Sequence, residues 1–200
     1  MPHATKAAAL LAALLLGACA SKPVTPPPAV GISIPQRYEA RILALQEWHS
    51  FVLVGRIAVK GAGLSGRLRW QQSPEGYQMH ISGPFGAGAL AIDGNGVQAH
   101  IRGKDIDLVT DTPEAVLARQ TGWRLPIAAL PYWVLGLPAP QPFAGMALDA
   151  AGQPLAFAQA GWQLQFGDYS DATPALPQKI IATQNGSEVT VTVESLAPLP

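Results

Sequence analysis

An alternation of apolar and polar residues with a period of two, repeated along most of the chain, limits the possible folds more than any other feature. Between residues 64 and 72, for example, Leu68 and Trp70 alternate with Arg67 and Arg69. Successive side chains of a strand point to opposite faces, so this pattern predicts a strand with one buried face and one solvent-facing face. Alternating or short apolar runs between turn residues predict about eleven strands: 51–60, 64–72, 77–82, 89–92, 97–101, 105–109, 144–148, 154–159, 162–169, 179–183 and 188–195.

Three segments carry helical signals instead. Residues 36–49 follow Pro35, a favourable residue at a helix start, and place Ile42, Leu45 and Trp48 on one face. Thr112-Pro113-Glu114 predicts the start of a short helix that runs to about residue 120. Residues 127–137 are apolar all round and contain a proline, which predicts one or two broken helical turns. This last segment is either a buried core helix or a lid that touches a ligand on its inner side.

Together these segments predict a mostly β (α+β) fold. A meander of about eleven strands must curl to bury one face, which gives an incomplete antiparallel β-barrel with helices forming a lid over its open side. Gly and Ala recur at inward positions, so we expect the interior to hold an apolar cavity rather than to be filled. Charged residues make up only 13% of the chain, against a typical value of about 25%, which also favours an apolar cavity or patch.

The beginning of the chain predicts export and lipidation. Lys6 precedes a short apolar run, and Leu16-Gly17-Ala18-Cys19 follows. A basic start, an apolar stretch of about ten residues and small residues before a cleavage site predict a signal peptide over residues 1–18. The tetrapeptide resembles the lipobox of bacterial lipoproteins, in which the cysteine carries acyl chains such as palmitate and becomes the first mature residue. A buried structural Cys19 is the alternative; a single cysteine allows no internal disulfide.

Residues 19–35 are predicted to link that anchor to one folded domain, residues 36–200. The segment is rich in proline, which favours a semi-extended tether. By resemblance to Gram-negative lipoproteins, Ala20-Ser21 lacks the aspartate that signals retention in the inner membrane, so we expect anchoring in the outer membrane, facing the periplasm. Without Lys6 the chain has 12 basic and 13 acidic residues, a net charge of −1, which argues against nucleic acid as a partner.

A large apolar residue occupies a predicted loop tip. Gly83-Pro84-Phe85-Gly86 separates the strands 77–82 and 89–92, and its proline and glycines favour a turn. At the tip of the loop, the ring of Phe85 has no part of its own hairpin opposite it to pack against. It is therefore either folded back under the hairpin or held out for a partner.

The sequence offers no convincing catalytic group. Gly63-Leu64-Ser65-Gly66 resembles an esterase elbow, but Arg67 stands where that motif requires glycine. His49, His80 and His100 lack metal-ligand spacing. Asp105 and Asp107 fit the solvent side of an edge strand. We therefore expect no enzyme activity, no catalytic residues, no metal and no cofactor.

Several motifs, spread over almost the whole chain, resemble the LolB family of outer-membrane lipoprotein receptors. They are the lipobox, Gly55-Arg56, Arg69-Trp70-Gln71-Gln72, Pro84-Phe85-Gly86, Trp133-Val134-Leu135-Gly136-Leu137-Pro138, Asp168-Tyr169 and Leu176-Pro177. The resemblance implies an incomplete barrel with an apolar cavity. It also implies that the protein accepts acylated lipoproteins from a periplasmic carrier, LolA, and places them in the inner leaflet of the outer membrane. We expect it to act as a monomer.

The resemblance also implies roles for individual residues. The family carries an exposed apolar residue, usually leucine, on a protruding loop needed for membrane insertion, and Phe85 between Pro84 and Gly86 stands in that place. Aromatic rings sit well at membrane interfaces. The residues expected to line the acyl-chain cavity are the strand residues that periodicity places inward and three residues of the predicted lid. The strand residues are Leu53, Ile57, Leu68, Trp70, Met79 and Ile81, and the lid residues are Trp133, Leu135 and Leu137.

Two other functions remain open at this point. The chain could be an envelope lipoprotein that binds a free lipid or amphiphile for storage or sensing. It could also be a structural envelope lipoprotein whose apolar segment docks onto a partner. Co-purified lipid that does not exchange would favour the first of these, and a filled barrel with no pocket would favour the second.

Overall fold

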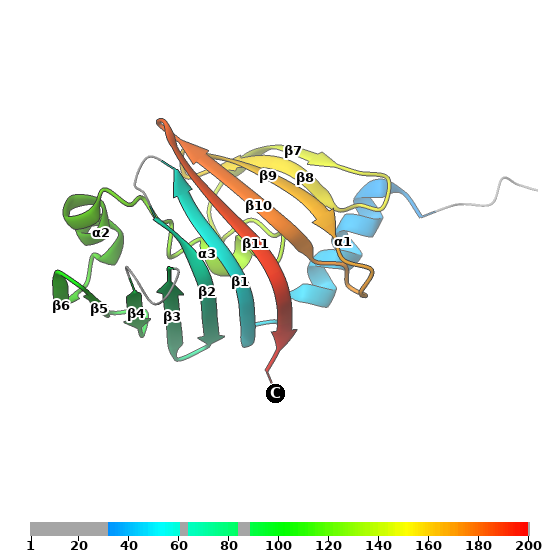
Figure 1. Cartoon of the computed structure of the whole chain (residues 1–200). Coiled ribbons are helices and arrows are strands. Elements are labelled where there is room, and N and C mark those ends of the chain that lie inside the picture. Colours follow the sequence, from blue (N-terminus) through cyan, green and yellow to red (C-terminus); the bar gives the residue numbers. More distant parts are fainter. Residues whose placement is uncertain (1–31, 61–63, 84–88, 200) are drawn as a thin grey trace, which may run out of the picture. The chain divides into compact units, whose positions relative to one another are not determined.

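The computed structural model describes residues 32–60, 64–83 and 89–199, and the contacts of the chain form a compact unit over Ile32–Pro200. Eleven strands lie within the described residues (Figure 1). Their bounds are β1 (Phe51–Lys60), β2 (Leu64–Ser73), β3 (Gly76–Ser82), β4 (Leu90–Gly94), β5 (Ala99–Gly103), β6 (Ile106–Thr110), β7 (Phe143–Leu148), β8 (Pro154–Gln159), β9 (Trp162–Tyr169), β10 (Pro177–Gln184) and β11 (Ser187–Pro198). The alternation of the sequence therefore identified every strand, with differences of a few residues at the ends.

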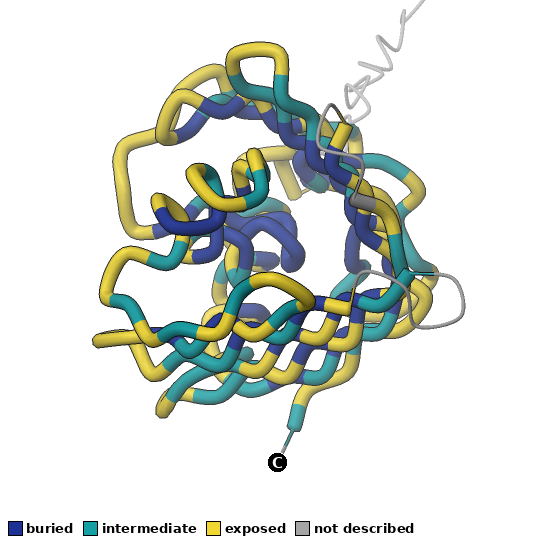
Figure 2. The backbone as a smooth tube through the Cα atoms, turned by 60° about the vertical axis from the view of Figure 1, so that its left-hand side comes forward, coloured by how far each residue is buried: buried dark blue, intermediate teal, exposed yellow. Residues whose placement is uncertain are grey.

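All eleven strands belong to one antiparallel sheet in the order β6-β5-β4-β3-β2-β1-β11-β10-β9-β8-β7. Two meanders, β1–β6 and β7–β11, thus meet where β1 pairs with β11. The sheet curves around a buried coil of chain (Figure 2), while β6 and β7 stand at its two edges. This open, curved sheet confirms the predicted incomplete barrel.

The seam between β1 and β11 contains a bulge, and a glycine allows it. The register shifts between Val54 and Gly55, so that Val54 faces Ser195 and Gly55 faces Val193. A Cβ atom on Gly55 would collide with the backbone carbonyl of Thr192. A bulge places an extra residue in one of two paired strands, which bends that strand and increases its twist. This bulge therefore helps to curl the sheet at its centre.

Three helices are found within the described residues. α1 (Ile34–Leu45) begins earlier than predicted, because the backbone N–H and hydroxyl of Ser33 both donate to Oε1 of Gln36 and cap its start. It also ends earlier than the predicted residue 49. α2 (Pro113–Thr121) starts where predicted, and it is terminated by the following Gly122, whose φ of 73° suits the left-handed end of a helix. α3 (Leu130–Trp133) is a single turn within the segment that was expected to be broken.

The core lies on the concave side of the sheet. β1 contributes Phe51, Leu53, Ile57 and Val59, which are at most 3% exposed, whereas Arg56, Ala58 and Lys60 face solvent. α3 and the chain around it lie on this concave side (Figures 1 and 2). Among the described residues, none of the helices is long and apolar enough to cross a bilayer.

Candidate functional site: the covered interior of the sheet

Residues 133–141, here called the interior segment, cover the concave face of the sheet. Trp133 and Val134 have no exposed surface, and the Trp133 ring packs edge-on against Trp162 of β9 with centroids 6.3 Å apart. Residues 133–137 of this segment are all buried, whereas Pro140 and Gln141 are exposed, so the buried part has no solvent-facing polar side that could orient it. Its position depends on the two buried polar residues of the described chain, Gln159 and Arg41.

Gln159, at the end of β8, uses all four of its hydrogen-bonding positions on this segment. Its Oε1 accepts from the Trp133 indole N–H and from the Ala139 backbone N–H, both at 2.9 Å. Its Nε2 donates to the carbonyls of Ala139 and Gln141, also at 2.9 Å. A buried amide satisfied in this way fixes the groups that it touches, so Gln159 holds both ends of the interior segment against β8.

Arg41 holds the middle of the segment from the other side. This residue of α1 donates from Nη2 to the Leu135 carbonyl at 2.7 Å and from Nη1 to the Ala175 carbonyl between β9 and β10. Its guanidinium lies over the Tyr169 ring, 5.3 Å from the centroid. Burial lowers the pKa of Arg41, while the nearby Tyr169 opposes that shift. The planar fork thereby joins α1, the interior segment and the β9–β10 connection.

Tyr169 and Gly136 complete this joint. The Tyr169 hydroxyl donates to the Pro154 carbonyl at 2.6 Å, and burial raises its pKa above the ordinary value. Gly136 has a φ of 70°, and a Cβ there would lie 3.1 Å from Arg41 Nη2 and 3.2 Å from the Tyr169 hydroxyl oxygen. Glycine is therefore required for the backbone angle and for the close approach.

The nine residues predicted to line the cavity are all buried, with exposures of 7% or less, and belong to one hydrophobic cluster. Of these, Leu135 and Leu137 line a pocket of about 280 Å³ together with Leu45, Phe51 and Tyr132. Ile57 borders a different pocket on the outer side of the sheet. The cluster brings the nine side chains into one interior, and their contact with acyl chains stays a prediction.

A larger apolar pocket lies elsewhere, among residues that the sequence reasoning did not select. This pocket, of about 530 Å³, lies between β3, β5, α2 and the chain before α3. Its apolar lining includes Tyr77, Val97, Ala99, Ala115 and Ile127, and Val97 is 78% exposed. A signal was present in the sequence for Ala99, which shares the inward phase of Ile101 on β5, whereas Val97 precedes that strand. We call this the α2 pocket.

Four buried side-chain atoms have no hydrogen-bond partner within the described residues: the Tyr38 hydroxyl, Nε of Arg41, and two atoms on β2. The two atoms on β2 are Nε1 of Trp70, a residue only 1% exposed, and Oε1 of Gln72. The Trp70 ring meets Phe51 edge-on, with centroids 5.2 Å apart. An unpaired buried donor is costly, so the interior offers a hydrogen bond that a ligand carbonyl could accept.

Other predicted site residues lie outside the described residues. These are the lipidation site Cys19 and the loop residues Pro84, Phe85 and Gly86. The flanking strands β3 and β4 do pair as the predicted hairpin, with Ile81 opposite Leu90. Among the residues that the structure describes, no group of three or more His, Cys, Asp or Glu side chains is placed to hold a metal ion.

Comparison with known proteins gives a consistent result. The family model described as "Outer membrane lipoprotein LolB" matches residues 49–195. An outer-membrane lipoprotein LolB of Chromohalobacter salexigens is 35% identical over 87% of this chain and 81% of that protein. The LolB of Alkalilimnicola ehrlichii is 35% identical over 94% of this chain and 95% of that protein.

Solved structures are similar only at a distance. A LolA-superfamily protein of Nitrosomonas europaea is 11% identical, with 85% of this chain and 96% of that chain aligned at a TM-score of 0.42. A likeness at this level carries no argument about function or partners.

Proposed function

Since this chain belongs to the LolB family of outer-membrane lipoproteins, we propose that it receives acylated lipoproteins from a LolA-like periplasmic carrier. It then inserts them into the inner leaflet of the outer membrane. The observation that carries the proposal is the family match, which covers the sheet from β1 to β11 and the interior segment.

The apolar interior supports acyl-chain binding. The α2 pocket has the size of ordinary ligand sites, which measure about 300–1,000 Å³, and its exposed edge at Val97 gives access from outside. The unpaired Trp70 N–H lies within the same hydrophobic cluster that holds Met79 and Ile81. An acyl chain carries ester or amide carbonyls at its head, and such a carbonyl would satisfy the indole donor.

Transfer along this route needs no nucleotide. Each CH₂ that leaves water gains about 0.8 kcal/mol, so an acyl chain moves spontaneously between sites of increasing apolarity. The protein supplies an apolar site between the carrier and the bilayer. Its own acylated Cys19 would keep that site at the membrane surface.

The Pro84-Phe85-Gly86 loop would serve the insertion step. It joins β3 to β4 at the end of the hairpin, and an aromatic ring at such a tip suits the membrane interface. We expect Phe85→Glu to leave folding and carrier binding intact and to block insertion into liposomes. Normal loading of liposomes by this variant would remove the loop from the mechanism.

The decisive experiment mixes residues 19–200 carrying Cys19→Ala with a carrier loaded with labelled lipoprotein, in the absence of ATP. Movement of the label to this protein is expected. If no label moves while circular dichroism shows a folded protein, the receptor function is wrong. Co-purified lipid that does not exchange would then point to storage of a free amphiphile.

A further inference from the structure

The outer face of the sheet carries an excess of positive charge, although the chain as a whole has equal numbers of basic and acidic residues. The strands β10, β11, β1, β2 and β3 carry five basic residues on this face and only two acidic ones, Glu188 and Glu194. The basic residues are Arg56, Lys60, Arg67, Arg69 and Lys179. The loops 61–63 and 84–88 carry no charged residue, so they leave this excess unchanged.

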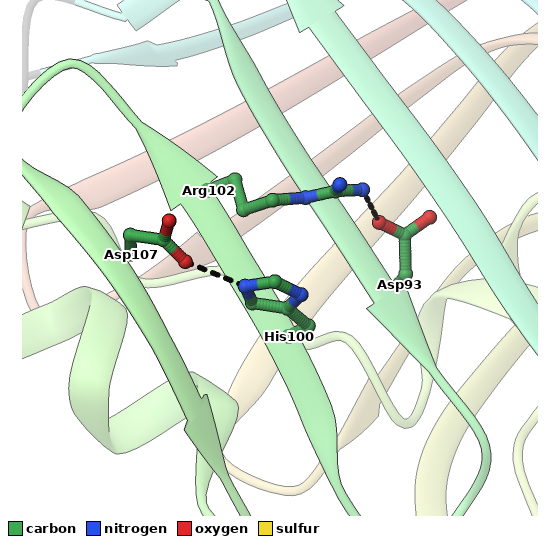
Figure 3. Close-up of polar contacts among 4 residues, drawn as sticks. All are labelled: Asp93, His100, Arg102 and Asp107. Atoms are coloured by element: carbon green, nitrogen blue, oxygen red, sulfur yellow. Dashed lines mark hydrogen bonds and ion pairs between the residues drawn. The ribbon is translucent and has the colours of Figure 1, made fainter.

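On the neighbouring strands β4–β6, in contrast, the charged side chains form ion pairs with one another (Figure 3). On β4–β6, Arg102 forms an ion pair with Asp93, and His100 Nε2 lies 2.6 Å from Asp107 Oδ1. On β1 and β2, Arg56 meets Glu194 at 3.2 Å, whereas Arg67 and Arg69 have no ion pair among the described residues. Of the four basic residues on this face without an ion pair among the described residues, two lie on β2, beside the centre of the sheet, and the others are Lys60 and Lys179.

A pocket of about 520 Å³ lies in the middle of this basic face. The register of the strands forms this pocket. One row across β11, β1, β2 and β3 consists of Thr192, Arg56, Arg67 and Ser82, in that order. In the adjacent row Thr190, Ala58 and Ser65 are short, which leaves a hollow beside the two long arginines. The lining thus presents two guanidinium groups and four hydroxyl groups.

We propose that this pocket binds the phosphate of an anionic phospholipid headgroup and docks the outer face of β1–β3 on the bilayer. Guanidinium forks bind phosphate oxygens in pairs, and hydroxyl groups donate to the same oxygens. Gly83 lines the pocket and immediately precedes the predicted insertion loop. The inference deepens the proposed function, because it identifies the surface that faces the membrane, but vesicle binding requires no client lipoprotein.

The test measures binding of residues 19–200 with Cys19→Ala to vesicles of equal parts phosphatidylglycerol and phosphatidylcholine. A basic residue near an anionic bilayer changes binding about fivefold, so Arg67→Gln should weaken binding about fivefold and Arg67→Glu about 25-fold. Arg67→Lys should bind more tightly than Arg67→Gln. Binding should also weaken as salt is added, since exposed charges are screened.

Arg124→Glu is the matched control, because Arg124 is exposed and lies between α2 and α3, outside the pocket. Equal weakening by Arg124→Glu and Arg67→Glu would show that only net charge matters and would overturn the proposal. So would a loss of carrier binding by Arg67→Glu with vesicle binding unchanged, which would make the face a protein interface. Client transfer from the carrier to soluble Arg67→Glu should stay normal, so failure of this inference leaves the receptor function untouched.

Discussion

The two ends of the curved sheet are covered in different ways. Over β8 and β9, the interior segment is fixed by two buried polar side chains, Gln159 and Arg41. Over β3–β6, α2 rests on the apolar Val116 and Leu117 and is tied to the next segment by an exposed hydrogen bond, from the Ala128 N–H to Glu114 Oε1 at 2.9 Å. The larger apolar pocket lies on this second side.

This difference assigns structural rigidity to one side of the sheet and ligand access to the other. Moving the interior segment would break several buried hydrogen bonds at once, each of which leaves a costly unpaired group. Moving α2 would break the exposed hydrogen bond between Ala128 and Glu114 and separate apolar surfaces that an acyl chain could cover in turn. We therefore expect the β8–β9 side to maintain the fold and the α2 side to admit the ligand.

The largest effect is expected from Gln159→Leu. Four groups of the interior segment would lose their partner inside the protein, and we expect a loss of about 3–5 kcal/mol in the free energy of unfolding. Denaturant titration measures this loss. Gln165→Leu, on the exposed face of β9, should change stability by less than about 0.5 kcal/mol, and equal effects would show that Gln159 is no anchor.

A smaller loss is expected from Arg41→Met. The carbonyls of Leu135 and Ala175 would be left unpaired, but relief from burying a charge offsets part of the cost, so we expect about 2 kcal/mol. Arg41→Lys should recover little, because an ammonium lacks the fork that reaches two carbonyls. Full recovery of unfolding free energy by lysine would mean that charge alone matters here.

On the α2 side, Ala115→Trp should act on transfer and not on stability. Ala115 is exposed and lines the α2 pocket, so the indole would fill the pocket with a change in unfolding free energy of less than about 0.5 kcal/mol. We expect several-fold slower uptake of labelled lipoprotein from the carrier. Gln120→Trp, on the same helix but outside the pocket, is the control. If Ala115→Trp takes up lipoprotein as fast as Gln120→Trp, the α2 pocket is not the site of uptake.

The smallest effect concerns pH. Burial, aided by Glu114 and Asp93, raises the pKa of Tyr77 from 10.0 to about 12. The folded state then holds the phenolic proton more tightly than the unfolded state, so this contribution to stability is complete below pH 10 and is lost as pH rises toward 12. Tyr77→Phe should flatten the dependence of unfolding on pH in this range, and an unaltered slope would assign it to other groups.

The sequence predicted the strands well because each needs only its own alternation. Leu53, Leu68 and Met79 were placed on the buried side by period alone, and all are buried. The predicted helical face, through Ile42, Leu45 and Trp48, includes the buried Leu45 but omits Arg41, the other buried residue of the helix. An arginine gives no apolar signal, so periodicity leaves it on the solvent side. Gln159 shares the inward phase of Phe157, a local signal whose meaning depends on which segment crosses it.

The pockets were harder to predict than the core, because a hollow depends on what is missing between distant strands. The outer hollow exists since Ala58 and Ser65 are short beside Arg56 and Arg67, and these residues adjoin only after β1 pairs with β2. The α2 pocket similarly requires β5, β3 and α2 to meet. Periodicity assigns a residue to a face but leaves its neighbours across the fold undefined.

The seam between β1 and β11 has a consequence for synthesis and export. β1 is the first strand along the chain and β11 the last, yet they pair side by side at the centre of the sheet. Contacts between residues so distant in sequence form slowly. A nascent chain can form the β1–β6 meander early, but its central edge stays open until β11 is synthesised. We expect this delay to keep the chain incompletely folded, as secretion requires. We also expect its unpaired edge to be bound by periplasmic chaperones.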